Sequence, residues 1–381
     1  DKEHKSTFQF CENGAKAVTW EATSKRVTPA FLAENSVSSL LAKSDFELEG
    51  YGRLTHPLRY DLASDTFRPV DWDEAFQRIG DVLRGLEPDQ VEFYTSGRAS
   101  NEAAYLFQLF AREYGTNNFP DCSNMCHEAT SVGLPRSIGI GKGTVSLDDF
   151  DKTELVISIG HNPGTNHPRM MGTLHELARR SVPIIVFNPL RERALERFAD
   201  PQSVIEMATY SSTDIASTYF QVKAGGDAAA LKGIAKHLLE MEAERGGVLD
   251  HAFIAEHTQG IEDFAADIAQ TRWDEIERES GLSQAALKKV AEAYAKSNAT
   301  IITYGMGITQ HNKGTANVRL IADLLLLRGN IGKPGAGICP LRGHSNVQGN
   351  RTVGISEKPT PAFLNSLKDV FGFEPPSHHG H

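Results

Sequence analysis

The chain is 381 residues long, with 40% hydrophobic residues, 23% charged residues and a formal net charge of −10. This length is sufficient for two or three domains with extensive apolar cores, and the composition is that of an ordinary globular protein. The acidic balance argues against general nucleic-acid binding, because displacing the counterions of phosphates requires a basic face.

The first fifty residues show no regular periodicity, so we expect an irregular segment with a short strand or turn over 16–20. A helix is predicted to begin at Trp72, since the preceding Asp71 is a suitable N-cap. Apolar residues recur on one face of this helix, which predicts that it packs inward. They are Ala75, Phe76, Ile79, Val82 and Leu83.

Strand patterns and helix patterns then alternate along the chain. Residues 91–97 are predicted to form a strand that runs into a turn of small residues, and largely apolar runs typical of buried strands occupy 155–160, 183–189 and 300–304. Helical patterns occupy 101–114 and 170–180, a further helix ends at Leu327, and 228–297 is mainly helical. Buried strands that alternate with amphipathic helices are typical of parallel sheets. We therefore predict an α/β fold with doubly wound, mainly parallel, Rossmann-like sheets in two domains around a crevice.

Polar loops follow two of these strands, and ligands of such sheets collect at the carboxyl ends of the strands. The loop Gly160–Gly164 lies between a strand and a helix, where backbone amides can bind phosphate oxygens. A plain chain reversal explains the same glycines equally well. Asn188 ends the next strand, at a place where a polar group often meets a ribose or a base.

The segment Gly329–Gly349 is rich in glycine and amide side chains, which predicts a long ordered loop held close to a large ligand. Within it, Arg342 could clamp a small carboxylate through two parallel hydrogen bonds. An ion pair or a contact to a cofactor phosphate is the alternative for this arginine. Cys339 is better interpreted as a packed thiol than as a metal ligand.

Cys126 stands directly before His127, so a soft metal ligand adjoins a group that titrates near neutral pH. Metal chemistry and proton transfer could therefore share one site. Taken by itself, the pair is better explained as a buried thiol next to a surface imidazole. The other motifs of the chain change that balance.

The chain has four cysteines, too few for a disulfide framework, which favours a reducing compartment or metal ligation. Its apolar runs are too short to span a bilayer, and the N-terminal residues lack the apolar region of a signal peptide. We expect a cytoplasmic protein. Because the sequence starts at Asp1 and stops at His381 without a recognisable end signal, we also expect an internal piece of a longer protein.

Several motifs in the same order resemble those of the molybdopterin oxidoreductases that carry molybdenum or tungsten with bis(guanine dinucleotide) pterin, and specifically the formate dehydrogenase alpha-subunit-like branch. The resemblance covers nearly the whole chain. Its motifs are Gly52–Thr55, Trp72–Ala75, Thr116–Asn118, Cys126–His127 with Thr130–Val132, Asn162–Pro163 with His167–Pro168, and Gly329–Gly349.

The resemblance implies roles for particular residues. Cys126 would ligate the metal, His127 would assist proton removal, and Arg342 would orient formate. Lys16 would bridge an iron-sulfur cluster and the proximal pterin, with Cys11 as a cluster ligand. Residues in segments that resemble those lining the two pterin dinucleotides are Asn162, His167, Asn188, Asp227, Gly307 and Gln348.

The sequence departs from the family pattern in three places. His344 stands where formate dehydrogenases commonly have glutamine after Arg-Gly, so we count it among the catalytic residues and regard formate itself as one candidate substrate. Only Cys11 represents the N-terminal cysteines that hold a [4Fe-4S] cluster in the family. The C-terminal β-barrel domain of the family has no counterpart in this sequence.

We expect three regions. Residues 1–50 would be a remnant of the iron-sulfur domain, 51–121 with 345–381 would bind one pterin dinucleotide, and 122–344 would bind the other. The expected activity is two-electron oxidation of a small carboxylate, with an electron-transfer protein or subunit as partner. The alternatives are a non-catalytic apo piece or accessory module of this fold, and an enzyme of the same fold with another substrate.

Overall fold

The computed structural model describes residues 15, 18–19 and 22–381, so Cys11, Lys16 and most of the strand or turn predicted over 16–20 lie outside the described residues. The described residues form two compact units, each of which is described by itself. The first unit comprises 96–99 and 121–349. The second comprises the described residues up to 95, together with 100–120 and 350–381.

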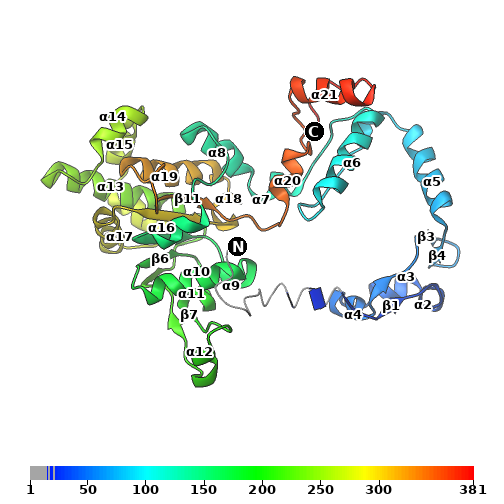
Figure 1. Cartoon of the computed structure of the whole chain (residues 1–381), viewed down its shortest axis with the longest axis horizontal. Coiled ribbons are helices and arrows are strands. Elements are labelled where there is room, and N and C mark those ends of the chain that lie inside the picture. Colours follow the sequence, from blue (N-terminus) through cyan, green and yellow to red (C-terminus); the bar gives the residue numbers. More distant parts are fainter. Residues whose placement is uncertain (1–14, 16–17, 20–21) are drawn as a thin grey trace. The chain divides into compact units, whose positions relative to one another are not determined.

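A five-stranded parallel sheet forms the centre of the first unit (Figure 1), with strand order β11-β10-β5-β6-β9. The strands are β5 (Leu155–Ile159), β6 (Ile184–Phe187), β9 (Thr218–Phe220), β10 (Thr300–Tyr304) and β11 (Gly337–Pro340). Ile302 of β10 pairs with Ile157 of β5 on one side and with Ile338 of β11 on the other. The strands predicted near 155, 183 and 300 are confirmed, and with them the α/β class.

Helices cover both faces of this sheet, because successive side chains of each strand point to opposite faces. Val156 packs in a cluster with α10 (Pro168–Arg179). Ile157 packs in a larger cluster on the other face, with α13 (Asp227–Arg245), α17 (Gln284–Lys296) and α19 (Gly314–Leu327). Figure 1 shows α10 and α19 on opposite sides of the sheet. Each fully buried aliphatic side chain stabilises this arrangement by about 1.5–3 kcal/mol.

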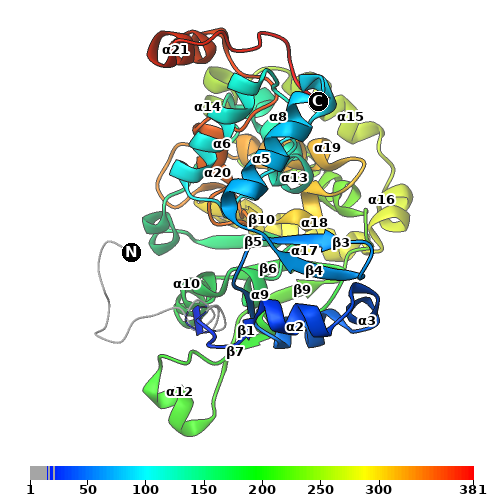
Figure 2. The same cartoon turned by 90° about the vertical axis from the view of Figure 1, so that its right-hand side faces the viewer.

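Shorter elements complete the first unit. They are α7 (Cys122–Cys126), α8 (Glu128–Ile138), η2 (Leu147–Asp151), α9 (Pro163–Asn166), α11 (Arg193–Glu196), α12 (Val204–Thr209), α14 (His251–His257), α15 (Ile261–Gln270), α16 (Trp273–Ser280), α18 (Met306–Thr309) and the antiparallel pair β7 (Arg197–Phe198) and β8 (Thr213–Asp214). The predicted helical region 228–297 is confirmed. Figures 1 and 2 both show α12 projecting from this unit beyond β7.

The segment Gly329–Gly349 is not the continuous loop that its glycines predict. It contains strand β11, which is parallel to β10, and it ends within α20 (Val347–Thr352). Pairing with β10 satisfies backbone groups that would otherwise need solvent. No helix of the described residues is long and apolar enough to cross a membrane.

The second unit begins with three short helices where an irregular segment was predicted. They are α2 (Pro29–Glu34), α3 (Val37–Leu41) and α4 (Asp45–Gly50), and their N-caps are Thr28, Ser36 and Ser44. The prediction was wrong because helices this short depend on their caps rather than on a long apolar period. The strands are paired as β1 (Arg26–Val27) with β2 (Arg53–Leu54), and β3 (Leu58–Asp61) with β4 (Thr66–Pro69).

Longer helices follow in the second unit. They are α5 (Trp72–Arg84), α6 (Asn101–Tyr114) and α21 (Pro361–Phe371), with the short η1 (Pro88–Gln90) between the first two. The start of α5 is confirmed, since the Asp71 carboxylate accepts a hydrogen bond of 2.7 Å from the Glu74 amide. Its predicted inward packing is wrong, because Phe76 is 62% exposed and none of its residues is buried.

The strand predicted over 91–97 is also wrong, since this stretch is irregular apart from a bridge at Thr95. Its apolar side chains are used in aromatic packing rather than in a sheet. Phe93 is buried against Phe119, with ring centroids 6.4 Å apart. The described part of the second unit thus contains two-stranded pairings in place of the second doubly wound sheet that we predicted.

Candidate active site

Cys126 is the last residue of the short helix α7, at the carboxyl edge of the sheet in the first unit. The helix begins at a capping box, in which the Asp121 carboxylate accepts from the Ser123 amide at 2.9 Å and the Asn124 side chain accepts from the Asp121 amide at 3.1 Å. The Cys126 carbonyl accepts from the Thr309 hydroxyl at 2.6 Å. These contacts fix the backbone on both sides of the thiol.

The loop after β11 lies against this thiol. The Gly343 amide donates to the Cys126 sulfur, and the Arg342 guanidinium is close enough to act on the thiol electrostatically. Burial raises the pKa of Cys126, while the Gly343 amide and the Arg342 charge oppose that rise. The same site therefore combines burial, which disfavours a thiolate, with the Arg342 charge and the Gly343 amide, which favour it.

His127 is fully buried and occupies the break between α7 and α8. Its Nε2 lies 2.9 Å from the Leu341 carbonyl and its Nδ1 lies 3.0 Å from the Thr130 hydroxyl. Burial, together with the Arg342 charge, lowers the pKa of His127 to about 4. The imidazole is therefore neutral at physiological pH in this structure.

His167 and His344 lie in the same region. The His167 Nε2 donates to the Arg342 carbonyl at 2.9 Å, which ties the loop before α10 to the loop after β11. A Cβ added to Gly97 would stand 2.8 Å from the Cys122 sulfur and 2.9 Å from the His344 Cβ. His344 thus reaches the base of α7 because a glycine leaves room for it.

Glycines permit a close approach of two loops at the carboxyl ends of β5 and β10. The Gly307 amide donates to the Gly160 carbonyl at 2.9 Å. A Cβ on Gly307 would lie 2.6 Å from that oxygen, and a Cβ on Gly305 would lie 2.5 Å from the His161 Cβ. Side chains are therefore excluded from this contact, and the loops after the two strands form one continuous edge.

His161 is buried at this edge, and its Nε2 is shared by the Ser158 hydroxyl at 2.8 Å and the Thr303 hydroxyl at 3.1 Å. Burial lowers the pKa of His161 to about 3. The described structure gives the buried Nδ1 atoms of His161, His167 and His344 no hydrogen-bond partner. Three ring nitrogens in this part of the unit thus remain able to bind a polar ligand.

The other predicted residues are spread along the sheet edge. Asn162 caps α9 and donates to the Glu192 carboxylate at 2.6 Å. The buried Asn188 follows β6, and its side chain lies 3.4 Å from the His161 carbonyl. Asp227 begins α13, where burial raises its pKa to about 6 against the opposing effect of His311.

Two further residues singled out in the sequence are Gln348 and Cys339. Gln348 is an exposed residue of α20. Cys339 lies in β11 and packs against the cluster around Val156, as expected of a packed thiol. Burial raises its pKa to about 11.

A cavity of about 620 Å³ opens beyond the carboxyl end of β6, and its lining residues are Arg191, Arg193, Glu196, Arg197, Ser212, Asp214, Ala216 and Tyr219. The Arg191 guanidinium is paired with Glu196 at 2.6 Å, and the Arg197 guanidinium is paired with Asp214 at 3.0 Å. Three arginines against two carboxylates leave this cavity with an excess of positive charge.

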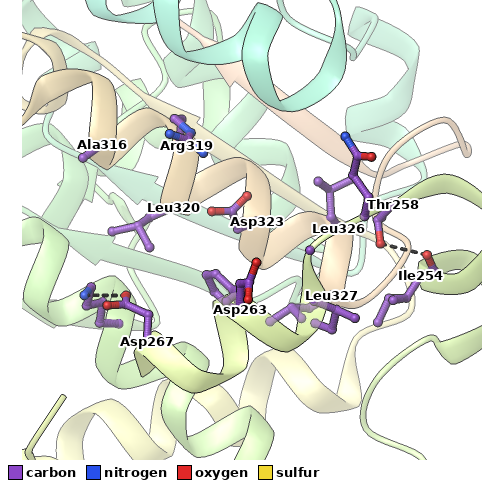
Figure 3. Close-up of a pocket in the computed structure, with 15 residues that line it drawn as sticks. Ile254, Thr258, Asp263, Asp267, Ala316, Arg319, Leu320, Asp323, Leu326 and Leu327 are labelled. Carbon is purple, nitrogen blue, oxygen red and sulfur yellow. Dashed lines mark hydrogen bonds and ion pairs between the residues drawn. The ribbon is translucent and has the colours of Figure 1, made fainter. Parts of the chain in front are cut away.

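A second cavity, of about 560 Å³, lies among α13, α14, α15 and α19 (Figure 3). Lys232 is paired here with Asp267 at 2.7 Å, and Arg319 faces the partly buried Asp323, whose pKa is raised to about 6 by burial. Its charges are nearly balanced, and none of the predicted site residues lines it.

The structure places polar side chains around the predicted residues to which the sequence assigned no role. Thr130, Ser158, Thr303 and Tyr304 all lie in buried segments and use their hydroxyls for the two histidines or for each other. A usable signal was present for two of them, because Ser158 and Thr303 are polar residues inside otherwise apolar strands. Buried polar groups require partners, so each should have predicted a polar neighbour across the sheet.

The sequence profile of the molybdopterin oxidoreductases matches residues 53–370. Among curated proteins, Protein YdeP of Escherichia coli K12 is 58% identical over the whole chain, which covers 51% of that protein. The uncharacterized oxidoreductase Rv2900c of Mycobacterium tuberculosis is 46% identical over 98% of the chain and 48% of that protein. A putative formate dehydrogenase of Staphylococcus aureus is 29% identical over 93% of the chain and 34% of that protein.

The chain thus spans about half the length of these two curated relatives, YdeP and Rv2900c. Among solved structures, the acetylene hydratase of Pelobacter acetylenicus superimposes with a TM-score of 0.62 at 17% identity, covering 87% of this chain and 39% of that one. At this identity the match concerns the fold. The profile match extends over most of the chain, and the chain belongs to the molybdopterin oxidoreductase family.

Proposed function

We propose that this chain is the cofactor-binding core of an enzyme that oxidises formate or a similar small carboxylate. The observation that carries the proposal is the loop after β11, whose Arg342 charge acts on the Cys126 thiol and whose Gly343 amide is hydrogen-bonded to the same sulfur. A metal-binding thiol and a carboxylate-binding cation are then available at one place. The name of the Staphylococcus aureus relative, a putative formate dehydrogenase, supports this choice of substrate.

The residues present fit the molybdenum or tungsten pterin cofactor that the family implies. A cysteine sulfur is a suitable soft ligand for such a metal. The unpartnered Nδ1 atoms of His161 and His167 offer polar contacts to a ligand at the sheet edge, and Gly305 and Gly307 let the backbone approach closely. When bound, this group would supply two-electron redox chemistry, and the protein would supply orientation and electrostatics.

The guanine dinucleotide form of the cofactor is part of the proposal, because the first unit offers suitable places for phosphates and a base. The arginine-rich cavity near Asn188 has the excess positive charge that phosphate groups require. Asp227 is a buried carboxyl whose raised pKa reflects a poor environment for a charge. A ligand that donates hydrogen bonds, as the amine edge of guanine does, would relieve that cost.

Arg342 would bind the substrate carboxylate through its forked guanidinium. In this structure its Nη2 donates a long hydrogen bond of 3.3 Å to the Gly141 carbonyl, which is weaker than a charge-assisted bond to a carboxylate would be. Charge-assisted hydrogen bonds of this kind contribute about 1.5–3 kcal/mol. Loss of the guanidinium is therefore expected to weaken carboxylate binding roughly ten- to hundredfold.

His127 would receive the proton that the reaction releases. Its Nε2 faces a carbonyl, which cannot donate, so this nitrogen carries the ring proton. The lone pair is then on Nδ1, where the Thr130 hydroxyl donates to it. Proton uptake by this ring must therefore occur at Nδ1, after the Thr130 hydroxyl has turned away.

The test uses the full-length protein, loaded with cofactor, and a dye as electron acceptor. We expect formate-dependent dye reduction in the parent protein, and a KM at least tenfold higher in Arg342→Gln. Arg319→Gln, which removes an exposed arginine of α19, is the matched control and should leave the KM unchanged. Cys126→Ala should lower the molybdenum or tungsten content. Retention of both metal and activity in Cys126→Ala would refute the proposed site.

A second candidate is an enzyme of the same family with a different substrate, and His344 favours it. This histidine replaces the glutamine that formate dehydrogenases commonly have, and its buried Nδ1 has no partner in the described structure. It would present an imidazole rather than an amide to the substrate. A panel of small oxidised and reduced substrates, measured on the parent protein and on His344→Gln, distinguishes the two. Formate activity that appears only in His344→Gln would select this candidate.

A non-catalytic role remains the alternative for the chain itself. Elemental analysis of the purified chain for molybdenum, tungsten and iron, combined with detection of released pterin dinucleotide, decides this question. Metal together with pterin is the expected result. A well-folded chain that acquires neither, even when coexpressed with the cofactor synthesis machinery, would identify an apo piece whose activity requires the remainder of the protein.

A further inference from the structure

His127 is part of a closed ring of hydrogen bonds. The Leu341 amide donates to the Tyr304 carbonyl at 2.8 Å, and the Tyr304 side chain leads to the Thr130 hydroxyl at 2.9 Å. The Thr130 hydroxyl lies 3.0 Å from His127 Nδ1, and His127 Nε2 lies 2.9 Å from the Leu341 carbonyl. The ring therefore returns to the residue at which it began, and it connects β10, α8 and the loop after β11.

The direction of every hydrogen bond in this ring follows from one carbonyl. Because the Leu341 oxygen can only accept, His127 Nε2 must donate to it. A neutral imidazole then has a lone pair on Nδ1, so Thr130 must give its single hydroxyl proton to that nitrogen. The Tyr304 hydroxyl must in turn donate to Thr130. This order assigns one proton to each of the three side-chain contacts.

We propose that Thr130 and Tyr304 are positioning residues that fix the ring tautomer of His127 and, through Leu341, the place of Arg342. The step from the ring to Arg342 rests on the proposed function, because it assumes that this arginine binds the substrate. Leu341 is held at both its amide and its carbonyl. Arg342 is the next residue in the chain, and its own carbonyl is held by His167. The arginine side chain thus projects from a backbone that is held at three polar groups of two neighbouring residues.

A purely structural role is the competing explanation, since Thr130, His127 and Tyr304 are all fully buried. Simple packing would make shape the decisive property of Thr130 and Tyr304. The proposal makes their hydroxyl protons decisive instead. Thr130→Val and Tyr304→Phe keep the approximate shape and remove the donor, whereas Thr130→Ser restores the donor with a smaller side chain.

The first measurement is 15N NMR of the chain labelled at histidine, and it requires no cofactor. His127→Gln identifies the His127 signals. We expect an unprotonated Nδ1 and a protonated Nε2 in the parent chain. In Thr130→Val the Nδ1 signal should move and the Nε2 proton should exchange faster with solvent, while Thr130→Ser should return both towards the parent. A protonated Nδ1 in the parent chain, or identical spectra for the parent and Thr130→Val, would overturn the proposal.

The second measurement is steady-state kinetics of the loaded full-length protein. Loss of one hydrogen bond of this kind should raise the KM for the carboxylate about fivefold in Tyr304→Phe, with a smaller effect on kcat. Tyr294→Phe is the matched control, because Tyr294 is an equally buried tyrosine of the same unit whose hydroxyl donates to Leu324. An equal KM increase in this control would overturn the link to Arg342.

The two measurements separate this proposal from the proposed function. If the parent protein has no activity on any carboxylate, the proposed function fails, and the NMR result alone decides whether Thr130 and Tyr304 fix the tautomer. If carboxylate activity is present and the NMR spectra do not respond to Thr130→Val, the function stands and the positioning role is refuted.

Discussion

Asp227 provides the sharpest test of the electrostatics of the first unit. This carboxyl is only 5% exposed, and burial raises its pKa to about 6 from an ordinary value of 3.8, although His311 opposes the rise. A group whose pKa is raised on folding binds its proton more tightly in the folded state. Its stabilising contribution is therefore complete below pH 3.8 and is lost as the pH rises through about 6.

The size of the effect follows from the two pKa values. The difference between about 6 and 3.8, at about 1.4 kcal/mol per pH unit, corresponds to about 3 kcal/mol at pH 8. Asp227→Asn removes this cost because an amide does not ionise. The favourable interaction of the charge with the first turn of α13 is already contained in this pKa, because the backbone hydrogen bond of Asp227 lowers it. We therefore expect a gain in the free energy of unfolding of about 3 kcal/mol at pH 8.

The assay is urea unfolding at pH 8 and pH 4, followed by the fluorescence of Trp273. The chain has three tryptophans, so a Trp20→Phe, Trp72→Phe background leaves Trp273 of the first unit as the reporter. Asp227→Asn should be more stable at pH 8 and should lose this advantage at pH 4. Equal gains at both pH values, or a loss at pH 8, would refute the reasoning.

The matched control for this prediction is Asp263→Asn. Asp263 also lies in the first turn of a helix, α15, but its side chain is exposed. It therefore shares the interaction with the helix N-terminus and lacks the cost of burial. We expect this control to lose stability slightly at pH 8. A gain as large as that of Asp227→Asn would show that burial is not the cause.

Three further substitutions test the packing of the first unit. Tyr294→Phe should lower the free energy of unfolding by about 1–3 kcal/mol, because it leaves the Leu324 carbonyl, now 2.7 Å from the hydroxyl, without that donor; urea unfolding measures this. Gly307→Ala should cost about 1–3 kcal/mol in the same assay, since its Cβ would stand 2.6 Å from the Gly160 oxygen. Gly172→Ala, with open space around its Cβ in α10, should instead stabilise by up to about 1 kcal/mol.

The sequence predicted the parts of the fold whose signals are local and strong. The strand Leu155–Ile159, which is apolar except for Ser158, and the helix Asn101–Tyr114 match the structure because burial and helical period determine each of them directly. The stretch around Phe93 has the same apolar character as a strand, but its side chains pack with other aromatic rings. Local composition does not distinguish these two uses of buried apolar residues.

In the candidate site, too, residues with a strong local signal were predicted, and residues that depend on distant contacts were not. Cys126 and Arg342 were recognisable because a motif stands around each of them, and the structure brings them together. Thr130 was named only as part of the motif around Cys126 and His127, without a role, and Tyr304 was missed, although they contact the same histidine or its partner. Their importance comes from hydrogen bonds between residues 174 positions apart, which no pattern within either segment reveals.

β11 makes the loop that carries Arg342 a direct continuation of the central sheet. Its last residue, Pro340, is paired with Tyr304, and the Leu341 amide donates a hydrogen bond to the carbonyl of the same tyrosine. Substitutions up to Leu341 therefore disturb strand pairing as well as the loop. The exposed Gly343 and the residues that follow it are free of that constraint. Related enzymes could consequently diversify in substrate from this position onwards while inheriting an unchanged anchor for the arginine.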